Sequence, residues 1–92
     1  MIRRRLVVTG KVQGVYYRAW FTEHARALGL AGWVRNRSDG SVEAVVEGSV
    51  AAVDRMIALA HEGSAAARVE QVAVSDDAPA EALTGFDQRS TA

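Results

Sequence analysis

The fold is decided by the stretch LVVTGKVQGVYYR, residues 6–18. Apolar and more polar residues alternate through its first half, which predicts a strand over residues 4–12 with one face in a core. The pair Gln13-Gly14 then predicts a turn. Tyr17 begins an apolar pattern of helical spacing that runs to Leu28, so a helix over 17–28 follows the turn directly, with Gly29 as its C-terminal stop.

The chain beyond this helix predicts a hairpin, a second helix and a further strand. Residues 30–36 and 41–47 read as strands joined by the turn Arg37-Ser38-Asp39-Gly40. Ser49 is a candidate cap for a helix that ends near Gly63. Val69, Val72 and Val74 predict a fourth strand. Asp76-Asp77-Ala78-Pro79 marks a loop, and residues 85–89 are either a short fifth strand or a loosely pinned tail.

This βαββαβ order predicts a ferredoxin-like α+β sandwich, an antiparallel sheet of strand order 4-1-3-2 with both helices on one face. The first two strands run in the same direction through a right-handed crossover. The residues that follow the first strand and those that end the second therefore lie at one edge of the sheet. We expect Arg18 and Asn36 to meet there, with room for a small ligand.

Composition indicates one small domain over residues 1–92. The chain is 49% hydrophobic and has no cysteine, which fits a modest core without disulfides and a cytoplasmic protein. The apolar run after the basic start Met1-Ile2-Arg3-Arg4-Arg5 is too short for an export signal, and no run is long enough to span a membrane. We expect a monomer without a membrane partner.

The charge pattern argues against a general polyanion binder. The formal net charge is zero, although residues 1–46 carry eight basic and three acidic residues and residues 47–92 the reverse. The run Arg3-Arg4-Arg5 reads either as a solvated strand entrance, which we favour, or as a binding patch.

Two segments carry the chemistry. The backbone amides of Gly14, Val15, Tyr16 and Tyr17, at the start of a helix, are placed to hold a phosphate together with Arg18. Asn36 ends a strand with a neutral amide that can orient water. Together they predict hydrolysis of a phosphate ester or anhydride without a metal.

These two segments closely resemble the acylphosphatase family. The family pattern V-x-G-x-V-Q-G-V-x-[FY]-R is met by residues 8–18, and L-G-L-x-G-W-V-x-N-x-x-D-G-x-V by residues 28–42. A looser correspondence continues to Gly85-Phe86. The resemblance implies metal-independent hydrolysis of a small acyl phosphate to a carboxylate and inorganic phosphate, with no cofactor. It also implies that Arg18 binds the phosphoryl group and that Asn36 positions the attacking water.

The chain departs from the family pattern in two places. Residues 63–67 lack a proline that often precedes the fourth strand, and Gln88 stands where the family usually has an apolar residue. We expect neither to touch the site. Inorganic phosphate, which is the product, should bind the loop and inhibit.

Several other residues have plainer interpretations. Trp33, Tyr17 and Phe21 match the spacing of buried faces and are expected in the core, whereas Tyr16 is free to flank the phosphate loop. Asp39 precedes a glycine and is expected to form the turn. His24 and His61 lack a third ligand and are expected at the surface rather than at a metal.

Two rival functions remain. An RNA-binding module shares this topology but needs exposed aromatic residues on the first and third strands, and residues 41–47 contain none. A catalytically silent phosphate-sensing domain is the second rival, and a turnover assay separates it from an enzyme.

Overall fold

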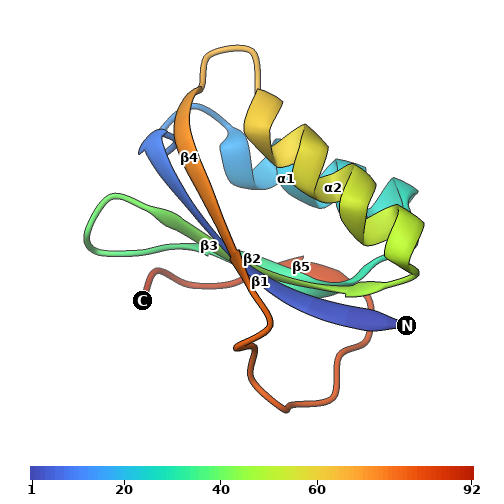
Figure 1. Cartoon of the computed structure of the whole chain (residues 1–92). Coiled ribbons are helices and arrows are strands. Elements are labelled where there is room, and N and C mark those ends of the chain that lie inside the picture. Colours follow the sequence, from blue (N-terminus) through green and yellow to red (C-terminus); the bar gives the residue numbers. More distant parts are fainter.

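The structure is a computed structural model that describes all of residues 1–92, and it confirms the predicted order of elements. Two helices pack on one face of a single twisted sheet (Figure 1). Observed and expected boundaries differ by no more than two residues for the first three strands and both helices. The elements are β1 (Ile2–Lys11), α1 (Tyr17–Ala27), β2 (Ala31–Asn36), β3 (Val42–Gly48), α2 (Val50–Glu62), β4 (Arg68–Ser75) and β5 (Phe86–Gln88).

The sheet has the expected central order and one additional strand. Its order is β4-β1-β3-β2-β5, and the first four strands pair antiparallel. β5 pairs with β2 in parallel, with Val34 opposite Gln88, so the sheet is mixed rather than wholly antiparallel. Of the two alternatives for residues 85–89, the short strand is therefore the one observed.

The main core lies between the sheet and the helices. Leu6 and Val8 from β1, Phe21 from α1 and Met56 from α2 are fully buried in it. α2 begins as predicted, since the Ser49 hydroxyl accepts a hydrogen bond from the Ala52 N–H at 3.1 Å. α1 has no such cap, because no side chain accepts a hydrogen bond from its first turn.

Trp33 is buried as predicted, but on the opposite face of the sheet from the helices. Strand alternation directs Val34 into the main core and Trp33 away from it. There its ring lies between the guanidinium groups of Arg35 and Arg89, 4.7 and 4.8 Å from the ring centroid, and its indole N–H donates to Glu81. The segment after β4 passes beneath this face and covers it (Figure 1).

Two arginines of the basic run at the start of β1, Arg3 and Arg5, are paired rather than solvated, which corrects the interpretation we favoured. Arg3 contacts Glu47 at 2.7 Å and also donates to backbone carbonyls at Pro79 and Glu81. Arg5 contacts Glu43 at 2.6 Å. The Arg3 bonds to Pro79 and Glu81 hold the covering segment against the sheet, and because Arg3 and Arg5 are paired the run is not a free patch for a polyanion.

The Glu43 carboxylate lies between two arginines on this same face. Arg5 and Arg35 approach its two oxygens at 2.6 and 2.8 Å, and its side chain is only 7% exposed. Burial alone would raise the pKa of Glu43, but the hydrogen bonds from Arg5 and Arg35 outweigh it and lower the pKa below the usual 4.5.

Replacement of Glu43 should therefore cost stability in a pH-dependent way. A carboxyl whose folded pKa is lowered stabilises the fold above its unfolded pKa and loses that contribution as the pH falls through the folded value. Glu43→Gln should lower the free energy of unfolding by about 1.5–3 kcal/mol at pH 7, the range for hydrogen bonds to charged groups. Urea unfolding from pH 7 to pH 3 measures the difference from wild type, which should shrink below about pH 4.5. A difference that does not change with pH would contradict this account.

The packing of β5 on the core should depend on Phe86, which is 2% exposed and whose ring centroid lies 5.7 Å from that of Phe21. Phe86→Ala should lower the free energy of unfolding by about 3–5 kcal/mol, because it leaves a cavity in the core. Val74→Ala, at a side chain 43% exposed on the other edge strand, is the matched control and should cost under about 1 kcal/mol. Equal losses in the two variants would mean that β5 is not packed on the core.

Candidate functional site

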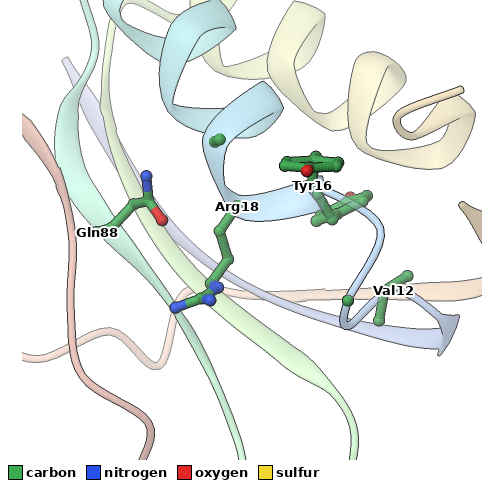
Figure 2. A pocket seen from close by; sticks show the side chains of 7 residues that line it. Val12, Tyr16, Arg18 and Gln88 are labelled. Atoms are coloured by element: carbon green, nitrogen blue, oxygen red, sulfur yellow. The ribbon is translucent and has the colours of Figure 1, made fainter. Parts of the chain in front are cut away.

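A pocket lies where the chain passes from β1 into α1 (Figure 2). Its volume is about 330 Å³, which suits a small ligand. Four residues predicted for the site line it together, namely Gly14, Tyr16, Tyr17 and Arg18. The remaining lining residues are Val12, Ala19 and Gln88.

The loop before α1 has the backbone geometry of an anion cradle. Gly14 and Tyr16 both have left-handed backbone conformations, with φ of 71° and 59°. The first hydrogen bond of the helix runs from the Trp20 N–H to the Tyr16 carbonyl, so the preceding N–H groups have no partner within the helix. Unpaired donors and the positive end of the helix dipole favour a negatively charged ligand at this point.

Arg18 brings an uncompensated positive charge to the pocket. Its side chain is half-buried, and its guanidinium forms no ion pair or hydrogen bond with the protein. Five other arginines are paired with carboxylates, namely Arg3, Arg5, Arg26, Arg35 and Arg89. Arg18 is therefore free to grip an anion with its planar fork of donors.

Hydrogen bonds from two side chains hold the loop before α1 in place. The Ser64 hydroxyl, in the turn between α2 and β4, donates to the Val15 carbonyl at 2.8 Å. The Gln13 side-chain amide donates to the carbonyls of Arg37 and Ser41 at 2.8 and 2.9 Å. Gln13 thus ties the loop to the turn between β2 and β3.

Asn36 ends β2 and is not part of the pocket wall. The Gln13 contact to Arg37 nevertheless joins the loop to the residue directly after Asn36. The Asn36 side-chain oxygen is buried and accepts no hydrogen bond from the protein. A buried acceptor without a partner costs free energy, so the Asn36 oxygen does not contribute a hydrogen bond to the stability of the fold. Whether Asn36 acts with Arg18 stays a prediction.

Two expectations about the departures from the family pattern are wrong. Gln88 does line the pocket, because the parallel pairing of β5 with β2 carries it to the mouth of the site (Figure 2). Ser64, in the segment without the proline, bonds directly to the loop. The Val15 side chain is 7% exposed and lies outside the pocket wall, and its carbonyl accepts the Ser64 bond, so the binding role of its backbone N–H stays a prediction.

Comparison with known proteins identifies the family. A family model described as Acylphosphatase matches residues 4–88. The chain belongs to the acylphosphatase family. The acylphosphatase of Acidovorax sp. (strain JS42) is 57% identical over 98% of this chain and 92% of the relative. That of Rhizorhabdus wittichii is 53% identical over 98% and 90%. The crystal structure of acylphosphatase from Bacillus subtilis superposes with a TM-score of 0.91 at 34% identity, covering 97% of this chain and 99% of that one.

The remaining polar groups of this acylphosphatase-family chain have structural roles. Asp39 accepts from the Ser41 N–H and hydroxyl at 2.9 and 2.6 Å, as expected of a turn former, and these bonds lower its pKa. The Tyr17 hydroxyl donates to the Ala60 carbonyl, and burial raises the pKa of Tyr17 so that it stays protonated. His24 is half-buried against Trp20 on α1.

Neither a membrane-spanning helix nor a metal-binding cluster stands out. No helix has the length and apolar character needed to cross a bilayer. No group of three or more His, Cys, Asp or Glu residues is arranged to hold a metal ion.

Proposed function

We propose that the protein is an acylphosphatase that hydrolyses the bond between a carboxyl group and phosphate without a metal. The observation that carries the proposal is the unpaired Arg18 guanidinium beside the uncapped start of α1, in a chain that matches the family over residues 4–88. Water adds to phosphorus, the bond from phosphorus to the acyl oxygen breaks, and its electron pair leaves with the carboxylate. The products are a carboxylate and inorganic phosphate.

The proposed role of the loop is to bind the phosphoryl group. Phosphoryl transfer needs little covalent chemistry from the protein, so positioning and stabilisation of charge on the oxygens do most of the work. The backbone N–H groups from Gly14 to Arg18 and the Arg18 guanidinium supply fixed donors for those oxygens. Ser64 and Gln13 hold the loop in shape, so the donors need not reorganise during the reaction.

Asn36 is proposed to orient the attacking water. A neutral amide can accept a hydrogen bond from water without placing a negative charge beside the phosphate. Its oxygen is buried and has no partner in the protein. Half a turn of the amide about its last bond places the oxygen where the nitrogen lies, and this turn breaks no hydrogen bond to the oxygen. The leaving group is a weakly basic carboxylate and needs little protonation, which fits a pocket whose wall contains no histidine or carboxylate.

Turnover in the presence of a chelator tests the activity and its independence of metals together. Benzoyl phosphate should release inorganic phosphate at an undiminished rate after exhaustive treatment with EDTA, because Arg18 and the loop supply the positive charge that a metal would otherwise provide. Loss of activity on chelation, with recovery on addition of Mg²⁺ or Zn²⁺, would sink the metal-independent mechanism.

The two rival functions receive less support. The strands β1 and β3 carry no aromatic residue, and the sheet face that an RNA would need is covered by the segment bonded to Arg3. A silent phosphate sensor would bind phosphate at the loop but would not turn over. The assay above separates the sensor from the enzyme.

We also propose that residues 1–92 act as one acylphosphatase-like domain, as a monomer in the cytoplasm. All five strands belong to one sheet, and the chain has no cysteine for disulfides. The substrate is a small acyl phosphate.

Inorganic phosphate should bind the loop and inhibit competitively, because amides at a helix start together with a guanidinium form a preorganised anion site. Titration followed by NMR should shift the amide resonances of residues 14–18. Arg68→Ala, on β4 and outside the pocket, serves as the charge-matched control and should leave the inhibition constant unchanged. If saturating phosphate raises no KM and moves no loop amide, the cradle has been misplaced.

Substitutions of Arg18 and of Asn36 should have different effects on kcat and KM. Arg18 contacts charge in the bound substrate and in the transition state, so Arg18→Ala should damage both KM and kcat. Asn36→Ala should lower kcat by about 10²–10³ with KM nearly kept, because it removes a contact to the water alone. Asn36→Asp should weaken phosphate binding as well, because it adds a negative charge. A folded Asn36→Ala variant with near-normal kcat would remove Asn36 from the mechanism.

A further inference from the structure

Tyr16 combines two unfavourable features at the edge of the pocket. It is the single residue other than glycine with a positive φ, at 59°. Its side chain is also 85% exposed, although most large apolar side chains of the chain are buried. Left-handed backbone is costly for a tyrosine, and glycine or asparagine would adopt it more readily. A strained residue held at a ligand pocket indicates a role in function.

The fold itself makes little use of the Tyr16 ring. The neighbouring aromatic residues stack on one another, with Tyr17 against Trp20 and Phe21, whereas Tyr16 takes part in no such pair. Its hydroxyl forms no hydrogen bond with the protein, in contrast to that of Tyr17. The curvature of the loop needs only the left-handed backbone. The ring is therefore free to contact a ligand in the pocket that it lines.

The position of Tyr16 relative to the proposed chemistry suggests what it contacts. Figure 2 shows Tyr16 and Gln88 on opposite sides of Arg18. Gln88 lies opposite Val34 on β2, and Asn36 is two residues further along that strand. The water held by Asn36 therefore approaches from the Gln88 side. In phosphoryl transfer the attacking and leaving oxygens are roughly in line, so the acyl group leaves on the Tyr16 side.

We propose that Tyr16 determines substrate specificity by packing its ring against the acyl group, and that the preferred substrates are acyl phosphates with a flat, apolar acyl group. This inference rests on the proposed function. A flat acyl group covers the exposed ring and gains apolar contact there, whereas a small acyl group such as acetyl does not reach far enough to gain much. Inorganic phosphate, which has no acyl group, gains nothing from the ring.

The experiment compares kcat/KM for benzoyl phosphate with kcat/KM for acetyl phosphate. Tyr16→Asn removes the ring and keeps a residue that tolerates the left-handed conformation, and Tyr16→Gly removes both ring and strain. In both variants the benzoyl-to-acetyl ratio should fall about three- to tenfold, the range for one aromatic contact. Tyr16→Phe is the matched control and should keep the wild-type ratio, because the ring and not the hydroxyl makes the contact.

The ratio separates specificity from damage to the cradle. A distorted loop would slow both substrates and weaken phosphate inhibition by a common factor, which cancels in the ratio. A ratio that stays within about twofold of wild type in both ring-less variants would overturn the role of Tyr16 while leaving the proposed function intact. A wild-type protein that releases phosphate from neither substrate would overturn the proposed function, and this inference with it.

Discussion

The candidate site depends on one side-chain amide, that of Gln13. Its two hydrogen bonds, to the carbonyls of Arg37 and Ser41, join the loop after β1 to the turn after β2. These two segments lie at one end of the sheet because β1 and β2 run in the same direction, with β3 between them. Topology brings them near, and Gln13 sets their spacing. The proposed reaction needs the loop and Asn36 at a fixed separation, because small errors in the positions of reacting groups slow a reaction strongly.

The two faces of the sheet serve different purposes. The face under the helices carries the apolar core, which holds α1 and its uncapped start in place. The other face holds the chain after β4 through hydrogen bonds from Arg3, and it carries Glu43 and Trp33, each between two arginines, with Arg35 shared by both. That chain leads into β5 and so brings Gln88 to the pocket. Arg18 is the one cationic side chain of the pocket wall.

Much of this arrangement could be predicted from local sequence signals. Period-two alternation gave β1, helical spacing gave α1, and the turn pair Gln13-Gly14 located the loop between them. The gathering of Gly14, Tyr16, Tyr17 and Arg18 in one pocket followed from these elements. Contacts between distant segments, such as the hydrogen bond from Ser64 to Val15, could not be predicted, because they leave no periodic pattern in the sequence. β5 is three residues long, too short for alternation to reveal its parallel pairing.

The central claim is that water attacks phosphorus while the loop and Arg18 hold the phosphoryl group. Hydrolysis of benzoyl phosphate in water enriched with ¹⁸O tests it most directly, with the label located by mass spectrometry of both products. The account predicts that the enzyme-catalysed reaction places the label in inorganic phosphate and leaves benzoate unlabelled. Label in the carboxylate of benzoate would mean that water attacks the acyl carbon, which would contradict the roles given to Arg18 and Asn36.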